Sequence, residues 1–195
     1  MILSCDKCNS IEIHRDICYN IFIKGVIKMN KKLEIAINSQ INFEIESAFI
    51  YLAMKNYLAT LSLDGFVNWF DIQFQEEMAH AQKFMNFINE RGGRVDITNW
   101  DSPKNDYKSV LEVLEASLAH EKKVTKRIHN LMKMAIEEMD YASVSLLQWY
   151  VDEQVEEEDN FSNLIEKVKL VKDAGLYMLD KELATRVFVP INLGA

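Results

Sequence analysis

The chain has 195 residues, of which 49% are hydrophobic and 27% charged, a composition that indicates neither intrinsic disorder nor a membrane span. Its formal net charge of −8 argues against nucleic acid or an anionic membrane surface as a partner. Only six glycines and two prolines occur, roughly a third of the share in an average protein, too few to punctuate a sandwich or barrel of many short strands. We therefore expect an all-α domain built from a few long helices.

Residues 1–28 are expected to be an N-terminal extension outside the fold, followed by a single domain over residues 29–195. The three cysteines all lie in this extension: Cys5, Cys8 and Cys18. No disulfide can therefore stabilise the main body, which favours a cytoplasmic location. With His14 the cysteines could hold zinc, but rubredoxin-type iron sites need two Cys-x-x-Cys pairs and only one is present. We expect no functional role for the extension.

Long runs without glycine or proline predict the elements of the domain. We predict main helices over residues 31–62, 65–91, 108–138 and 141–172, and a short fifth helix near 177–187. The turn at 139–143 is placed where Asp140 or Ser143 can cap a new helix. Short turns make the first and second helices antiparallel neighbours, and likewise the third and fourth. The connection from Gly92 to about Tyr107 is long enough to run the length of a bundle, which predicts a four-helix bundle with one long crossover.

Each main helix carries a glutamate on its apolar face. In the first helix, Ile41 and Ala48 flank Glu44 at helical spacing. The corresponding polar residues of the other helices are Glu77 with His80, Glu121 and Glu157. Each glutamate lies at a similar depth in its helix, so the four carboxylates should meet at one level. His120 and His129 lie off the apolar faces, and we expect both to face solvent.

The four inward glutamates predict a pair of divalent metal ions. A buried unpaired carboxylate costs several kcal/mol, and like charges close together raise each other's pKa values. Two divalent ions would balance the four negative charges, and Glu77 and His80 can grip one ion from the same helix face. Oxygen-rich ligation with one imidazole suits iron or manganese, and the absence of cysteine argues against structural zinc. A single glutamate beside an apolar face is usually a boundary residue with its carboxylate in water. A single histidine there is usually a hydrogen-bonded core residue. Only the combination of these residues favours a metal site.

The motifs around these residues closely resemble those of the ferritin family, specifically the non-haem ferritins of bacteria. They read NFE at 42–44, QEEMAH at 75–80, AHE at 119–121 and LQWYVDEQVEEE at 147–158. The resemblance implies a ferritin-like bundle with a short fifth C-terminal helix. It also implies a ferroxidase centre, in which Glu77 bridges two irons whose other ligands are Glu44 and His80 for one, and Glu121 and Glu157 for the other.

The same resemblance implies roles for neighbouring residues. Gln154 would lie beside the centre and bind or orient oxygen-derived ligands, with Tyr51 and Trp149 as surrounding aromatics. A third iron site would use three further glutamates: Glu76, Glu153 and Glu156. These three also fit a solvated acidic face that binds nothing.

The function implied by the resemblance is iron storage and detoxification. The chain would oxidise Fe(II) to Fe(III) with dioxygen and deposit a ferric oxyhydroxide mineral inside a homo-oligomeric cage of twenty-four subunits. The alternative is a di-iron peroxidase or oxidase of the rubrerythrin type, but such enzymes usually carry a second Glu-x-x-His where this chain has Glu153-x-x-Glu156. Bacterioferritin also uses that histidine and binds haem through a methionine. Met78 stands at the matching position, yet we expect no haem, because non-haem relatives can have methionine there too.

Overall fold

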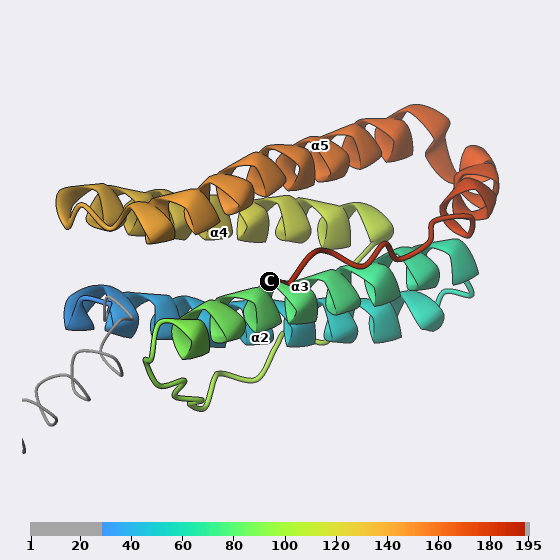
Figure 1. Cartoon of the computed structure of the whole chain (residues 1–195). Helices are drawn as coiled ribbons and strands as arrows, with labels where there is room; N and C mark the ends of the chain where they lie inside the picture. Colours follow the sequence, from blue (N-terminus) through green and yellow to red (C-terminus); the bar gives the residue numbers. More distant parts are fainter. Residues whose placement is uncertain (1–28, 194–195) are drawn as a thin grey trace, which may run out of the picture.

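The computed structural model describes residues 29–193, apart from the side chains of 172–174, and holds helices without strands over that range. Its helices are α2 (Lys31–Ala59), α3 (Asp64–Glu90), α4 (Val110–Glu137) and α5 (Tyr141–Leu183) (Figure 1). The predicted all-α bundle is confirmed. None of the described helices combines the length and apolar character needed to cross a bilayer. The extension, with its cysteines and His14, lies outside the described residues.

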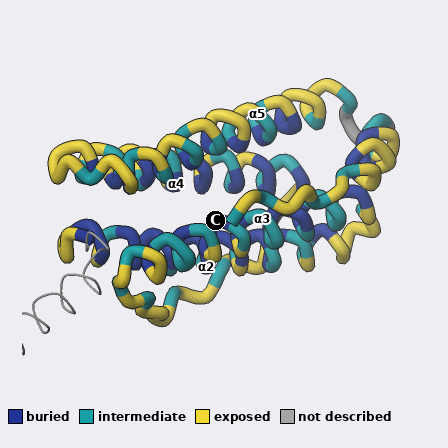
Figure 2. Tube along the Cα trace, in the orientation of Figure 1, coloured by how far each residue is buried: buried dark blue, intermediate teal, exposed yellow. Residues whose placement is uncertain are grey.

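Two antiparallel pairs make up the bundle. Helix α2 packs against α3, α4 packs against α5, and the pairs meet through contacts of α2 with α4 and of α3 with α5. The segment between α3 and α4 runs back along the bundle, so α3 and α4 point in the same direction (Figure 1). Figure 2 shows the buried faces of all four helices turned toward a common interior. The predicted long crossover is therefore present.

Two asparagines fasten the crossover to α2. Asn38 donates from Nδ2 to the Arg94 carbonyl at 2.9 Å and accepts from the Asp96 amide at 2.8 Å. Asn42 repeats the pattern one turn later, because its Nδ2 donates to the Asp96 carbonyl and its Oδ1 accepts from the Thr98 amide. Side chains four residues apart lie on one helix face. The two asparagines therefore supply hydrogen-bond partners to backbone groups of the crossover, which belongs to neither a helix nor a sheet.

The expected short C-terminal helix forms the last part of α5, which bends near its end and folds over the end of the bundle (Figure 1). The helix departs from regular geometry at Gly175, where an added Cβ would lie 2.6 Å from Val171 Cβ. In a regular helix, Cβ atoms four residues apart are about 5–6 Å apart. After the bend, Leu179 and Leu183 are buried in the core. The bend thus lets a single helix close the bundle.

The core consists of two apolar clusters, and on every helix the inward glutamate lies near the border between them in sequence. One cluster contains Ile41, Phe84, Val124 and Tyr150. The other contains Tyr51, Phe70, Leu114 and Phe161. Each main helix therefore contributes apolar side chains on both sides of a polar level at mid-bundle.

Candidate metal centre

The charged residues of this polar level are almost completely buried. None of the following has more than 3% of its surface exposed: Glu44, Glu77, His80, Glu121 and Glu157. They come from all four helices, one from each except α3, which supplies both Glu77 and His80. Acidic side chains are almost never buried this deeply without a partner. The bundle interior therefore contains a polar site that apolar packing alone does not explain.

Three of these side chains converge closely enough to bind one ion. Glu44, Glu77 and His80 each offer one ligand atom, and the three atoms lie within 4.8 Å of one another, the one such group in the part of the chain described. Glu44 Oε2, Glu77 Oε2 and His80 Nε2 are buried and have no hydrogen-bond partner. Buried polar atoms without partners are costly, and a bound cation would satisfy them. The donor set of two carboxylates and one imidazole fits iron.

Two of the carboxylates accept a hydrogen bond from a glutamine side chain. Gln40 donates from Nε2 to Glu44 Oε1 at 2.9 Å within α2. Gln73 of α3 donates from Nε2 to Glu157 Oε2 across the bundle at 3.0 Å. Each bond fixes one oxygen of its carboxylate and thereby sets the orientation of the whole group.

Glu121 is held by two donors. The Tyr51 hydroxyl donates to Glu121 Oε1, and Gln154 Nε2 donates to Glu121 Oε2 at 3.3 Å. Gln154 is itself buried, and its Oε1 lies 2.9 Å from the Thr125 hydroxyl. Tyr51 and Gln154, two of the three neutral residues expected around the centre, therefore both contact one of its carboxylates.

Around His80 the contacts are weaker than around the carboxylates. Its Nδ1 lies 3.7 Å from Glu77 Oε2, and its Nε2 lies 3.7 Å from Glu153 Oε1, distances beyond normal hydrogen-bond length. The ring meets Trp149 edge to face at 5.5 Å. The Tyr150 hydroxyl donates to the His80 carbonyl at 2.8 Å. The imidazole is thus positioned by packing, while its Nε2 has no hydrogen-bond partner and remains open to an ion.

Burial makes the negative charges of the centre unfavourable. It raises the pKa of Glu121 to about 8, with the charge of Glu157 as the next cause. Burial is also the largest cause that raises the pKa values of Glu44, Glu77 and Glu157 above the usual carboxyl value. A divalent cation reverses this balance, because it favours the ionised carboxylates. The centre is therefore electrostatically suited to cations.

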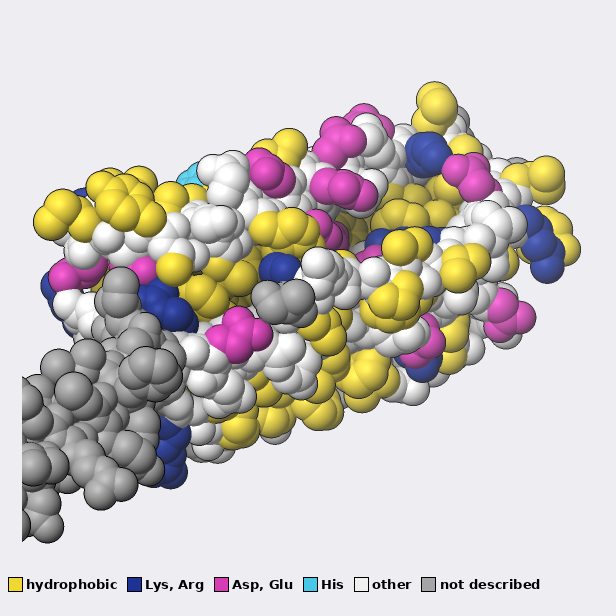
Figure 3. Space-filling view, viewed as in Figure 1, with side chains coloured by type: hydrophobic (Ala, Val, Ile, Leu, Met, Phe, Trp, Pro, Cys, Tyr) yellow, Lys and Arg dark blue, Asp and Glu magenta, His cyan; other side chains and the backbone are white. Residues whose placement is uncertain are grey.

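The glutamates considered for a third site are not gathered in the same way. Arg186 holds Glu76 with two bonds from Nη2, of 3.1 and 2.8 Å. Burial nevertheless raises the Glu76 pKa to about 7, although Arg186 opposes the shift. Glu153 lies near His80, whereas Glu156 is exposed on α5, where acidic side chains gather along the surface (Figure 3). In this structure an arginine is the cation that Glu76 contacts.

The solvent-facing position expected for His120 is wrong. Only 7% of its surface is exposed, and its Nε2 lies 2.7 Å from Ser47 Oγ. Its ring also stacks on Phe43 at 5.3 Å. Both partners belong to α2, which packs close enough to α4 to cover a residue at the edge of the inward face. His129 is exposed, as expected.

Comparisons with known proteins identify relatives of this chain in sequence and in fold. Residues 35–171 match the model of the ferritin-like domain. A bacterial non-heme ferritin of Staphylococcus aureus (strain MRSA252) is 41% identical over 162 residues, which are 82% of this chain and 98% of the relative. An open pore ferritin from the hyperthermophilic archaeon Archaeoglobus fulgidus is 44% identical with a TM-score of 0.81, covering 82% of this chain and 100% of that one. A humanized archaeal ferritin is also 44% identical, with a TM-score of 0.81, covering 83% of this chain and 100% of that one.

Proposed function

The chain belongs to the ferritin family, whose general role is iron storage, and from this premise we propose that it oxidises Fe(II) with dioxygen at the buried centre. The ferric product would be deposited as an oxyhydroxide mineral inside an oligomeric cage. Storage and detoxification are then one activity, since oxidation removes reactive Fe(II) from solution. The absence of cysteine from residues 29–195 suits action in the reducing cytoplasm.

The observation that carries the proposal is the set of three buried ligand atoms without hydrogen-bond partners on Glu44, Glu77 and His80. These three residues are proposed to bind one Fe(II). Glu77 would bridge to a second Fe(II), whose further ligands are Glu121 and Glu157. Two divalent ions would then balance the four carboxylates at this level.

The residues around the ions would control the reaction. Each Fe(II) gives one electron to dioxygen, so a pair of ions with two protons reduces one dioxygen to hydrogen peroxide. Gln154 and Tyr51 hold Glu121, and Gln154 lies where it could bind or orient oxygen-derived ligands. Carboxylate ligands bind Fe(II) firmly enough to react and still let the ferric product leave.

Assembly is part of the same proposal. A mineral needs an interior volume, and we propose a cage of twenty-four subunits, as the family resemblance implies. The rubrerythrin-type alternative is not favoured, because the buried residues of α5 that face the centre three residues apart are Gln154 and Glu157, and neither is a histidine. A third iron bound by Glu76 would have to displace the contact of Arg186 with that carboxylate.

Stopped-flow oxidation tests the proposal. Fe(II) is added without oxygen, the solution is mixed with air, and Fe(III) formation is followed by absorbance. We expect the unaltered protein to oxidise about two Fe(II) per subunit rapidly and His80→Ala to fall to the rate of free Fe(II). His129→Ala is the matched control, because it removes an exposed histidine of α4, and its rate should be unchanged. Rapid oxidation by His80→Ala would refute the assignment.

Gel filtration of the iron-loaded protein separates storage from the peroxidase alternative. A very large particle that carries rust-coloured iron through the column is expected. A small oligomer that oxidises iron without retaining it would contradict the storage role.

A further inference from the structure

The two glutamines behind the centre are each held between a carboxylate and an arginine. Gln40 donates to Glu44, and its Oε1 accepts from Arg127 Nε at 2.8 Å. Gln73 donates to Glu157, and its Oε1 accepts from Arg186 Nη1 at 2.6 Å. Both glutamines are at most 1% exposed. The same arrangement of carboxylate, amide and guanidinium therefore occurs twice, on opposite sides of one site.

The chemistry of the partners permits one orientation of each amide. A guanidinium can only donate hydrogen bonds, and an ionised carboxylate can only accept them. Between the two, a glutamine must turn its oxygen to the arginine and its nitrogen to the carboxylate. The reverse orientation would place oxygen against oxygen on one side and donor against donor on the other. Each arginine therefore fixes the direction in which its amide acts.

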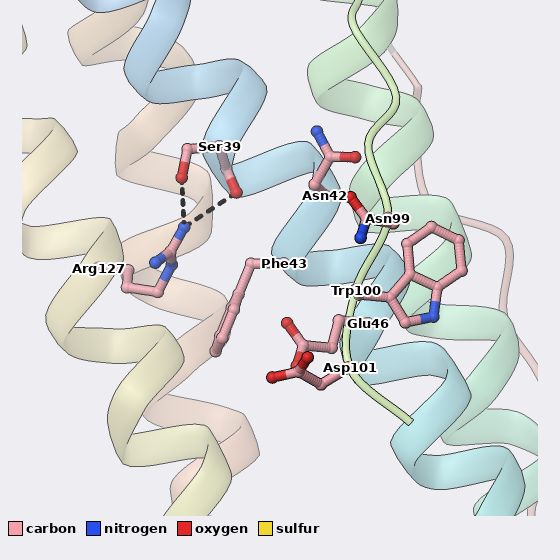
Figure 4. Close-up of a pocket in the computed structure, with 8 residues that line it drawn as sticks. All are labelled: Ser39, Asn42, Phe43, Glu46, Asn99, Trp100, Asp101 and Arg127. Carbon is pink, nitrogen blue, oxygen red and sulfur yellow. Dashed lines mark hydrogen bonds between the residues drawn. The ribbon is translucent and has the colours of Figure 1, made fainter. Parts of the chain in front are cut away.

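Arg127 is itself anchored to α2. It reaches from α4, and its Nη2 donates to the carbonyl and the hydroxyl of Ser39 at 2.9 and 3.0 Å. Its guanidinium also lies over the Phe43 ring at 4.2 Å. Figure 4 shows these contacts at the margin of a surface pocket of about 300 Å³ between α2, α4 and the crossover. With all these contacts made, Arg127 has little freedom to leave Gln40.

Arg186 is anchored by a different part of the chain. It follows the end of α5, and besides Gln73 it pairs with Glu76 through two bonds from Nη2. Its guanidinium lies 4.0 Å from the centre of the Trp69 ring. Gln73, Glu76 and Trp69 all belong to α3. Arg186, which follows α5, is therefore fixed to the helix that also carries the proposed ligands Glu77 and His80.

Gln154, the third amide at the centre, has a different partner on its oxygen. The oxygen of Gln154 lies beside the Thr125 hydroxyl, which can either donate or accept a hydrogen bond. The orientation of Gln154 is therefore set by Glu121 alone, whose carboxylate accepts from the Gln154 Nε2. Gln40 and Gln73 differ from Gln154 because their oxygens face an arginine, which can only donate.

We propose that Arg127 and Arg186 are positioning residues that lock the Gln40 and Gln73 amides toward Glu44 and Glu157, and so raise the affinity of the centre for divalent metal ions. The inference rests on the proposed function, because it assumes that these carboxylates bind metal. Neither arginine is proposed to touch the ions.

Binding of Co(II) to the metal-free protein tests the proposal without any redox reaction. Affinity is measured by calorimetry and by the visible absorption of bound Co(II). Arg127→Met and Arg186→Met should each weaken binding about tenfold, the usual effect of losing a residue behind a metal ligand. Arg91→Met is the matched control, because it breaks the two-bond ion pair with Asp140. It should change thermal stability without changing Co(II) affinity.

A positioning role makes two further results necessary. Arg127→Met should cause no additional loss in a Gln40→Met background, and Arg186→Met none in a Gln73→Met background, because each arginine acts through its glutamine. Lysine also only donates hydrogen bonds, so Arg127→Lys and Arg186→Lys should recover most of the affinity and also keep the variants folded.

The outcomes separate this inference from the proposed function. Arginine variants that bind Co(II) as tightly as the unaltered protein overturn it, as do losses that add within either pair. An unaltered protein that binds no Co(II) overturns the proposed function and the inference together.

Discussion

Glu121 illustrates the conflict between stability and metal binding at this centre. Its carboxyl group is completely buried, and its pKa is raised to about 8 by burial, with Glu157 as the next cause. The folded metal-free protein therefore retains a proton there at pH values where the unfolded chain has lost it. Stability should fall as pH rises from the usual carboxyl pKa toward 8.

Glu121→Gln should remove this cost together with the function. The neutral amide has nearly the same shape, so we expect the metal-free variant to be about 1–2 kcal/mol more stable near pH 8, with a smaller gain at pH 5. Metal binding should be strongly weakened, because the second ion of the proposed pair loses one of its carboxylate ligands. Urea unfolding at both pH values, after chelation of metals, measures the first effect, and Co(II) titration measures the second.

Glu115→Gln provides the control for this substitution. Glu115 lies on the same helix but is exposed, so its variant should match the unaltered protein in stability and in Co(II) affinity. A Glu121→Gln variant that is less stable than the Glu115→Gln variant near pH 8 would contradict the electrostatic explanation.

The ease of predicting a residue depended on where its partners lie. Glu44 and His80 interrupt apolar faces of their own helices, so a periodic pattern alone indicates burial. Arg186 gives no such signal, because its contacts with Gln73 and Glu76 depend on how the chain turns after α5. Gln40 and Gln73 offered a weak signal, since each lies four residues before an inward glutamate. The sequence could not show which carboxylate each amide would reach.

At the scale of elements, Asp140 determines where α5 begins. Its Oδ1 accepts from the Ser143 amide at 3.1 Å, and both its oxygens bind Arg91, at 3.0 and 2.9 Å. Burial alone would raise the pKa of Asp140, but the Arg91 and Ser143 bonds outweigh it and lower the pKa below the usual value. Asp140 therefore joins the cap of one helix to the end of another.

Asp140→Ala should lower the free energy of unfolding by about 2 kcal/mol at pH 7, since a helix cap and a charge-assisted pair are lost together. A carboxyl whose pKa is lowered by folding stabilises the protein above its unfolded pKa of about 4. That stabilisation is lost as pH falls through the lower, folded value, so the difference between variant and unaltered protein should shrink in acid. Urea unfolding between pH 7 and pH 3 checks this. Asp106→Ala, at an exposed position, should show no difference at any pH.

Gly65 allows α5 to close the bundle. Its amide and that of Phe66 donate to Asp180 Oδ1 at 2.8 and 3.0 Å, so a residue of α5 caps α3. A Cβ at Gly65 would lie 1.7 Å from the Asp180 carbonyl oxygen. Gly65→Ala should therefore cost about 3 kcal/mol, because a backbone atom must move. Thermal unfolding measures the loss, and Gly93→Ala, whose contacts begin at 3.1 Å, should cost less.

Helix boundaries were predictable where local chemistry sets them. The sequence predicted a cap at Asp140 or Ser143, and the structure shows that Asp140 is the cap. The junction of α5 with its terminal part was predicted as a break because Gly175 usually ends a helix. In the structure the helix instead continues and bends, because packing of Leu179 and Leu183 on the core compensates for the glycine.

At the scale of the whole molecule, the described chain leaves apolar side chains in contact with water. Several are large and more than 60% exposed: Ile35, Tyr141, Val155, Leu170, Tyr177 and Met178. Scattered exposed apolar residues are normal, but contiguous patches of them indicate contact surfaces. In the proposed assembly we expect some of these side chains to lie at contacts between subunits, and fold class alone could not have identified them.

Residues 1–28 should be dispensable for both assembly and oxidation. The relatives are matched over 98% of their length by 82% of this chain, so the bundle is the part they share. The bundle's first anchors are Met29, which is 3% exposed in the core, and Asn30, which caps α2 by accepting from the Lys32 amide at 2.8 Å. A chain beginning at Met29 keeps both anchors, so its behaviour in gel filtration and its rate of Fe(II) oxidation should match those of the full chain.

A deletion of residues 1–32 removes both anchors. It should lower the free energy of unfolding by about 2 kcal/mol, the cost of a lost cap and a buried side chain. A small or unfolded product from the shorter deletion would show that the extension belongs to the fold.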